Sequence, residues 1–192
     1  MKIIQLNALP TDEADKYVEQ VGKLFHCEWK DCEPDYATED SAILAVARRV
    51  AVEPLFVAID EDGTLAGVAA ISSDEYHVGI CAANGMASRY IGRDFTVVER
   101  YRQQEFAGLS VWEHLLRGVL QWVSLHGNGA NWFVVFADLS SPRRLVNLLA
   151  RHGVRNLRSM PRRDFPARSV GILQCNVRLA LASLDESLTN WC

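Results

Sequence analysis

Apolar residues along this chain gather either in short continuous runs or at a spacing of three to four, which predicts alternating strands and helices. The run KIIQL at residues 2–6 predicts a first strand. Apolar side chains at helical spacing follow, and Thr11 is the expected N-cap of this first helix. A polar loop leads to Thr38, the expected N-cap of a second helix that reaches about Val50.

The middle of the chain carries the clearest strand signals. The β-rich runs at residues 55–60 and 64–72 flank the turn sequence EDG at 61–63, which predicts a β-hairpin. Residues 76–91 hold two glycines and show no clear period, so we expect a long connection there. RDFTVV at residues 93–98 predicts another strand.

The second half alternates helix and strand. Apolar positions at helical spacing predict a long helix over residues 108–126, and the continuous apolar run NWFVVFAD at 131–138 is typical of a strand buried on both faces. A serine-proline start and a glycine end predict a helix over 141–153. The tail VGILQCNVRLALA at 170–182 predicts a last strand, antiparallel at a sheet edge.

This order of elements predicts an α/β (α+β mixed) fold. A hairpin in the middle of the chain gives antiparallel pairs, and the strand-helix-strand segment behind it gives a parallel pair, so the sheet should be mixed. Neither repeats nor low-complexity linkers interrupt the chain, and one domain over residues 1–192 suffices.

Composition places the chain among ordinary globular proteins: of 192 residues, 49% are hydrophobic and 23% charged. Because no apolar run approaches the roughly 20 residues that span a bilayer, we expect no membrane segment. The N-terminus lacks the shape of a signal peptide, so a cytoplasmic location is expected. The net charge of −4 divides into −9 for residues 1–90 and +5 for 91–192. The basic residues neither cluster nor alternate with aromatics, which excludes nucleic acid as an expected partner.

The five cysteines are odd in number and form no Cys-x-x-Cys pair, which fits a reducing compartment. His26, Cys27 and Cys32 lie close together, but without a second ligand pair at zinc-like spacing we expect no metal site. The remaining histidines show no ligand spacing and no paired nucleophile, so they receive no chemical role: His77, His114, His126 and His152.

Four stretches, in this order, resemble the GCN5-related N-acetyltransferase (GNAT) superfamily: LFHCEWKD at 24–31, the hairpin at 54–72, FTVVERYRQQEFAG at 95–108 with the long helix behind it, and SSPRRLVNLLARHGV at 140–154. The resemblance implies a central mixed, mostly antiparallel sheet of about six to seven strands flanked by about four helices. It also implies acetyl-CoA as co-substrate.

In the resembled family, backbone N–H groups at a helix N-terminus surround the diphosphate of the cofactor, and glycines allow the close approach. The resemblance assigns cofactor binding to Val97, Val98, Arg102, Gln103, Gln104, Glu105, Phe106, Ala107, Gly108 and Arg143.

Two registers of this loop are open. Anchoring on Tyr101-Arg102 puts Glu105 at the first glycine, where its side chain and charge oppose phosphate binding. Placing Ala107-Gly108 at the first glycine instead lengthens the loop by about two residues and turns Glu105 to solvent. We prefer the second register, because the first would bury two polar residues of the following helix, Glu113 and His114, at a greater free-energy cost than a longer loop.

For catalysis, the resemblance favours Asp94, then Glu99, as the general base, with a backbone N–H of the Val97–Val98 strand polarising the thioester carbonyl. The alternative for both carboxylates is a solvated pair with Arg93, Arg100 or Arg102.

Glu28 and Trp29 could line an amine pocket, although Trp29 also fits a core position. Leu149 stands where many members carry the tyrosine that protonates the leaving thiolate, a step that leucine cannot perform. Arg143 and Arg144 oppose their helix dipole, which indicates either a nearby CoA phosphate or an exposed pair in water.

Two functions follow. The first is acetyl transfer from acetyl-CoA to a primary amine on a small molecule or a protein. The second is a catalytically impaired relative that binds or inhibits a protein partner. The cofactor loop separates them, because catalysis predicts retained backbone donors and impairment predicts their loss.

Overall fold

The computed structural model describes residues 1–31, 33–73, 75–83, 85, 88–127, 132–138, 150–162 and 165–190. Most of the helix expected over 141–153 lies outside the described residues, and so do Arg143, Arg144 and Leu149.

A seven-stranded sheet runs through the middle of the molecule in the order β1-β2-β3-β4-β7-β9-β8. Neighbouring strands are antiparallel except β4 and β7, which are parallel. This confirms the predicted mixed, mostly antiparallel sheet. The strands are β1 (Lys2–Gln5), β2 (Leu55–Ile59), β3 (Leu65–Ser72), β4 (Ile91–Val97), β7 (Trp132–Asp138), β8 (Arg155–Arg162) and β9 (Phe165–Asn176).

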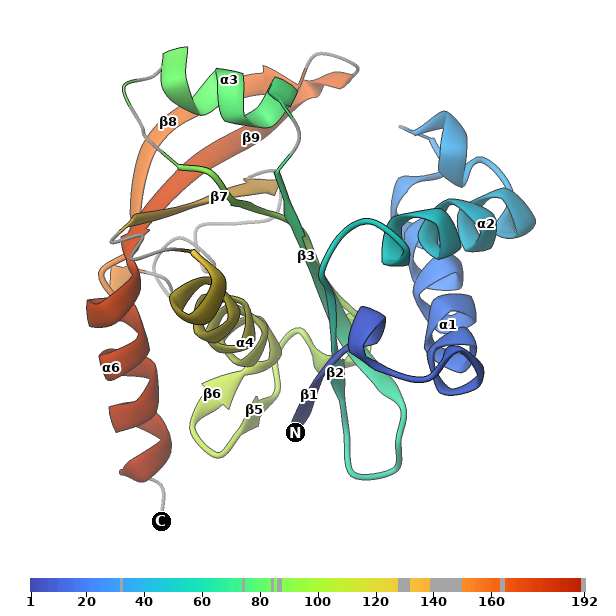
Figure 1. The fold of residues 1–192 in the computed structure, drawn as a ribbon, viewed down its shortest axis with the longest axis horizontal. Helices are drawn as coiled ribbons and strands as arrows, with labels where there is room; N and C mark the ends of the chain where they lie inside the picture. The colour runs from blue at the N-terminus through green and yellow to red at the C-terminus, as the bar shows by residue number, and fades with distance from the viewer. Residues whose placement is uncertain are drawn as a thin grey trace.

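Helices cover both faces of this sheet (Figure 1). α1 and α2 lie together beside β2 and β3, whereas α4 and α6 lie on the opposite face. α3 lies near β7 and β9, where Cys81 packs on Ile91, Val134 and Ile172. The described α-helices are α1 (Thr11–Trp29), α2 (Glu39–Val50), α3 (Glu75–Ala83), α4 (Val111–His126) and α6 (Val177–Thr189).

The alternation of side chains along β2 explains why there are two cores. Phe56 and Ala58 point to the α4 face, and Leu55, Val57 and Ile59 point to the α1–α2 face. All five are buried, so β2 reads as a continuous apolar run with a helix layer on each side.

Two helix starts differ from their predictions. α1 begins at Thr11 itself, with Pro10 as N-cap. α4 begins at Val111 rather than Gly108, because Ser110 forms a capping box with Glu113. The predicted cap of α2 is confirmed: the Thr38 side chain accepts a hydrogen bond from the backbone N–H of Ser41.

Two other expectations are wrong in part. The connection expected over 76–91 contains most of α3. The tail is a strand only as far as Asn176, whose side chain accepts a hydrogen bond from the Leu179 N–H and so begins α6. β9 also lies between β7 and β8 rather than at the edge of the sheet.

The parallel pair opens soon after it forms. β4 and β7 are in register at only two positions, Ile91 with Val134 and Gly92 with Val135. The rest of β4 therefore pairs with β3 on one side and separates from β7 on the other.

Candidate active site and the N-terminus of helix α4

The backbone of β4 presents one particular amide to the opening. The N–H of Val98 donates to the carbonyl of Ala66 in β3 at 2.9 Å. Val97, opposite Gly67, is therefore in a non-hydrogen-bonded pair, and its N–H and C=O point away from β3. Of the two amides expected to polarise a thioester, Val98 is thus engaged with β3, and Val97 faces the opening.

A register shift between Val68 and Ala70 marks a bulge in the pairing of β3 with β4, and Asp94 lies within it at φ 55°. A left-handed backbone at a residue other than glycine costs roughly 1–3 kcal/mol and is common at functional sites. Consecutive strand side chains normally point to opposite faces. Here both Arg93 and Asp94 reach residues at the end of α2.

Arg49 joins three elements at this point. Its guanidinium donates to Glu53 at 3.1 Å, to the Tyr36 hydroxyl at 3.1 Å and to Asp94 at 2.6 Å. The Arg49 side chain is 14% exposed and that of Asp94 is 33% exposed. Asp94 also lies 3.4 Å from Arg93, so it is an ion-paired carboxylate at the rim of the opening.

Burial and charge act in opposite directions on this cluster. Burial disfavours the charged form of Arg49, but Asp94, Tyr36 and Glu53 together hold its pKa above the usual value. Burial also raises the pKa of Tyr36, against the influence of Arg49. At neutral pH the cluster therefore holds a charged guanidinium and a protonated phenol.

The structure brings two predicted substrate and cofactor residues together. Arg102 donates from Nη2 to Glu28 at 2.5 Å and from Nε to the carbonyl of Val97 at 3.1 Å. It therefore links the end of α1 to the end of β4. Trp29 is partly buried against the α1–α2 core, the plainer of its two predicted places.

The remaining predicted residues of this segment point elsewhere. Glu99 is exposed in a short 3-10 helix (Glu99–Tyr101). Gln103 is also exposed, and Gln104 donates from its side chain to the carbonyl of Arg100 at 2.8 Å.

The predicted phosphate loop is a β-hairpin. β5 (Glu105–Phe106) pairs with β6 (Leu109–Ser110), and both turn residues have positive φ, 50° at Ala107 and 77° at Gly108. This is the geometry of a two-residue type I′ turn. The sequence predicts that the N–H groups of Phe106, Ala107 and Gly108 surround the diphosphate. This segment instead consists of two paired strands and the turn between them. Glu105 is exposed, as the preferred register expects.

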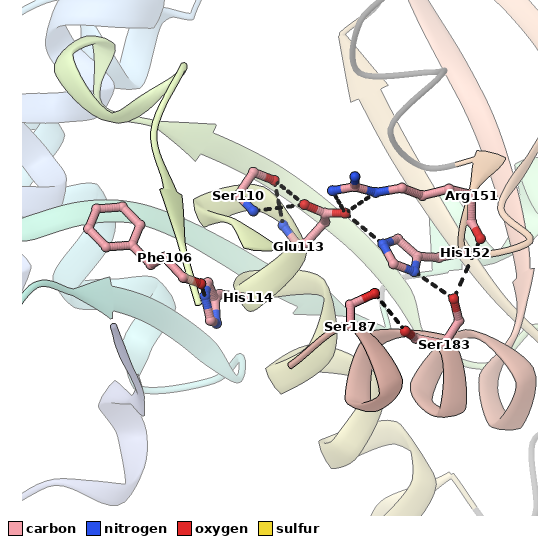
Figure 2. A network of polar contacts seen from close by, with 8 residues as sticks. All are labelled: Phe106, Ser110, Glu113, His114, Arg151, His152, Ser183 and Ser187. Atoms are coloured by element: carbon pink, nitrogen blue, oxygen red, sulfur yellow. Dashed lines mark hydrogen bonds and ion pairs between the residues drawn. The ribbon is translucent and has the colours of Figure 1, made fainter. Parts of the chain in front are cut away.

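Glu113 closes the N-terminus of α4 (Figure 2). Its Oε2 accepts from the backbone N–H and from the hydroxyl of Ser110, each at 2.7 Å. The Ser110 hydroxyl oxygen in turn accepts from the Glu113 N–H at 3.3 Å. Two backbone donors at the start of the helix are thereby used by this capping box.

The other carboxylate oxygen meets residues from a distant part of the chain. Oε1 accepts from Arg151 Nε at 2.7 Å, from Arg151 Nη2 at 2.5 Å and from His152 Nε2 at 2.6 Å. His152 Nδ1 lies 2.9 Å from the hydroxyl of Ser183 in α6. Figure 2 shows Arg151 and His152, from the segment before β8, meeting Glu113 of α4, while Ser183 of α6 meets His152.

The Glu113 side chain is fully buried, and burial raises the pKa of its carboxyl. The hydrogen bonds from His152, Ser110 and Arg151 outweigh that effect and lower the pKa to about 2. At neutral pH Glu113 is therefore an anion at the positive end of the α4 dipole, where an acid is stabilising.

The argument that favoured the second loop register is wrong, because both Glu113 and His114 are buried. Glu113 has the partners described above. His114 lies with Nε2 2.8 Å from the carbonyl of Phe106, and burial lowers its pKa, so it is neutral and donates. The partners of Glu113 lie 38 and 39 residues away, beyond the reach of a spacing argument.

Sequence reasoning also missed the role of His152, to which it assigned no chemistry. Its environment depends on α6 and α4 together, and no local pattern shows that. The Ser110-x-x-Glu113 spacing, however, is a capping-box signature that does predict the start of α4.

The diphosphate of CoA does not fit at this helix start. An anion there requires free N–H groups and an uncompensated dipole. Here the N–H groups of Ser110 and Glu113 are engaged, and a carboxylate already holds the position. Trp112 fills the first turn and stacks on Phe95 with ring centroids 4.4 Å apart.

The fold is that of the N-acetyltransferases of the GNAT family. Spermidine N-acetyltransferase from Vibrio cholerae in complex with CoA and spermine has a TM-score of 0.60 and 13% identity, over 94% of this chain and 97% of that chain. A GNAT-family acetyltransferase from Streptococcus pneumoniae has a TM-score of 0.57 and 15% identity, over 91% and 98%. Ribosomal-protein-alanine N-acetyltransferase from Brucella melitensis has a TM-score of 0.60 and 10% identity, over 92% and 99%. No family model matches the sequence, and no curated protein sequence does.

Within the described part of the chain, none of the helices combines the length and the apolar character needed to cross a membrane. The described residues also contain no group of three or more histidine, cysteine or acidic side chains that could hold a metal ion.

Proposed function

We propose that this chain is a single-domain cytoplasmic N-acyltransferase that transfers an acetyl group from the thioester of acetyl-CoA to a primary amine. The observation that carries the proposal is the opening of β4 from β7 after two paired positions. It leaves the amide of Val97 directed into the opening and the strained residue Asp94 at its rim.

The chemistry needs only groups that are present there. The Val97 N–H donates to the thioester carbonyl oxygen and stabilises the negative charge that develops on it. Asp94 accepts the proton of the attacking amine, directly or through water, and Arg49 holds the carboxylate in place. The new C–N bond forms, the C–S bond breaks, and the thiolate takes a proton from water, giving an amide and a free thiol.

An amine acceptor suits the face between α1, α2 and β4. Glu28, Glu53 and Asp94 supply carboxylates there, each held by an arginine. The Thr96 hydroxyl is buried and has no hydrogen-bond partner among the residues that the structure describes. Thr96 pairs with Val68, which packs in the α1–α2 core, so its side chain shares this face. The spermidine acetyltransferase with the same fold holds spermine, a polyamine, which supports an amine as acceptor.

The test is acetyl transfer by purified protein to a panel of polyamines, amino acids and peptide amines, followed by mass spectrometry and thiol release. Asp94→Asn should lower kcat by about 100-fold or more, the usual contribution of a general base. Glu99→Gln, an exposed carboxylate five residues away, should stay within about twofold. Thermal unfolding of both variants checks that the fold is retained. Equal activity of Asp94→Asn and wild type would remove Asp94 as the base, and no acetylated product from any amine would overturn the proposed function.

One observation favours a second candidate, a catalytically impaired domain that binds a protein partner. The helix start that would grip a diphosphate holds Glu113 instead. In that case the protein would turn over no thioester at all, with or without the CoA nucleotide.

A further inference from the structure

We infer that Glu113 takes the place of a ligand phosphate at the N-terminus of α4, so that the acyl donor is recognised by its acyl-pantetheine end and not by its diphosphate. The inference rests on the proposed function for the choice of donor. The closure of the helix start stands on its own geometry, and the two parts are tested separately below.

The first step concerns the donors at the start of α4. Two of the first N–H groups, those of Ser110 and Glu113, are bound within the capping box. The preceding backbone is paired in the β5–β6 hairpin, with Phe106 opposite Leu109. A phosphate could use these two donors only by breaking the bonds of the capping box.

The second step concerns charge. The carboxylate of Glu113 already balances the positive end of the α4 dipole, and Arg151 and His152 are bound to the same oxygen. A diphosphate beside this carboxylate would be repelled. If Glu113 moved out, it would leave His152 buried without its partner, because that side chain is only 1% exposed.

The third step concerns Arg102, the other described residue that is expected to bind a phosphate of the cofactor. Arg102 is 43% exposed, but its guanidinium is bound to Glu28 and to the carbonyl of Val97. It therefore borders the opening where the thioester would lie, rather than the start of α4. The amide of Val97 remains directed at that opening, so the thioester end of a donor keeps its contact.

The donor experiment compares acetyl-CoA with S-acetylpantetheine, which has the same thioester and amides but no nucleotide or diphosphate. We expect kcat/KM values within about threefold of each other. A preference for acetyl-CoA of about 100-fold or more would show a working diphosphate grip and overturn the inference. If neither compound is a donor, the proposed function fails. The binding experiment described next then tests by itself whether the N-terminus of α4 is closed to phosphate.

The binding experiment titrates inorganic diphosphate, then CoA, while the backbone amide resonances of Ser110, Val111 and Glu113 are followed by NMR. The wild-type amides should not shift at millimolar diphosphate. Glu113→Ser replaces the carboxylate with a small hydroxyl, so diphosphate should then bind at least about tenfold more tightly. Glu105→Ser is the matched control, because it removes an exposed carboxylate from the adjacent hairpin and should give no gain.

Saturable shifts in the wild-type protein below millimolar diphosphate would overturn the inference. A folded Glu113→Ser protein that binds no more tightly would show that Glu113 is not what closes the site, and would overturn it as well. If Glu113→Ser does not fold, the wild-type titration still decides whether the helix start is closed.

Discussion

Asp94 and Glu113 are both carboxylates bound by arginine. Their surroundings differ in exposure, and this difference suits Asp94 to a catalytic role and Glu113 to a structural one. Both oxygens of Glu113 are fully enclosed, and its partners use each of them. Asp94 is one third exposed, sits on a left-handed backbone and borders the point where two strands part. A substrate can approach Asp94, whereas Glu113 can only hold the fold together.

At the residue scale, the first prediction concerns Arg49, whose planar fork meets Glu53, Tyr36 and Asp94 at once. Arg49→Lys keeps the charge but cannot reach all three partners. We expect it to lower the free energy of unfolding by about 2–3 kcal/mol in urea titrations, because two partly buried carboxylates lose a partner. Arg117→Lys is the control, because the Arg117 side chain is 32% exposed and that of Asp185 is 52% exposed, so loss of this ion pair should change stability by less than about 0.5 kcal/mol. Equal losses in both variants would contradict the prediction.

At the scale of elements, the signals that predicted structure correctly were local ones. The EDG turn between β2 and β3 and the Thr38 cap of α2 lie within a few residues of what they determine. The parallel placement of β4 and β7 follows from the helix that connects them. The position of Asp94 in a strand of this parallel pair could therefore be predicted from the sequence, whereas its role as the general base stays a prediction.

Elements whose ends depend on distant partners could not be predicted. The sequence of the β5–β6 hairpin predicts a phosphate loop, because an Ala-Gly pair fits a glycine-rich motif as well as a type I′ turn. The burial of Glu113 depends on Arg151 and His152, which only the packing of α6 on α4 brings near. The arginines and the leucine expected in the helix over 141–153 lie outside the described residues, so those expectations stay predictions.

The turn of the β5–β6 hairpin predicts opposite changes in the free energy of unfolding for substitutions at its two residues. Ala107 has φ 50°, a conformation that costs an alanine roughly 1–2 kcal/mol and a glycine almost nothing. Ala107→Gly should therefore raise the free energy of unfolding by about 0.5–1 kcal/mol, after the entropy that glycine loses. Gly108→Ala, next to it at φ 77°, should lower it by about 1–2 kcal/mol. Thermal unfolding of the pair measures both, and shifts in the same direction would rule out the type I′ turn.

At the scale of the whole molecule, Glu113 connects segments that the sheet alone does not. It lies in α4, and its partners Arg151 and His152 come just before β8. The other ring nitrogen of His152 contacts the hydroxyl of Ser183 in α6. α6 itself buries Val177, Ala180 and Leu184 against the core beneath α4. The polar bridge therefore helps to fix the position of α6 on α4, together with this apolar contact and the Arg117–Asp185 ion pair.

The last prediction is that this bridge makes part of the stability of the whole protein sensitive to acid. The pKa of Glu113 falls from 4.5 to about 2 on folding. A lowered pKa gives stability that is fully present above pH 4.5 and is lost as the pH falls toward 2. By linkage, this contribution is roughly 3 kcal/mol.

Glu113→Gln cannot titrate, so it should be less stable than the wild type at pH 7, and the difference should narrow between about pH 5 and pH 2.5. The pKa of His114 is lowered mainly by burial, which is common to both proteins, so most of its cost to stability in acid cancels in the difference. Urea unfolding of both proteins at half-unit pH steps measures the gap, and a gap that stays constant with pH would mean that the bridge to Arg151 and His152 does not hold the carboxylate.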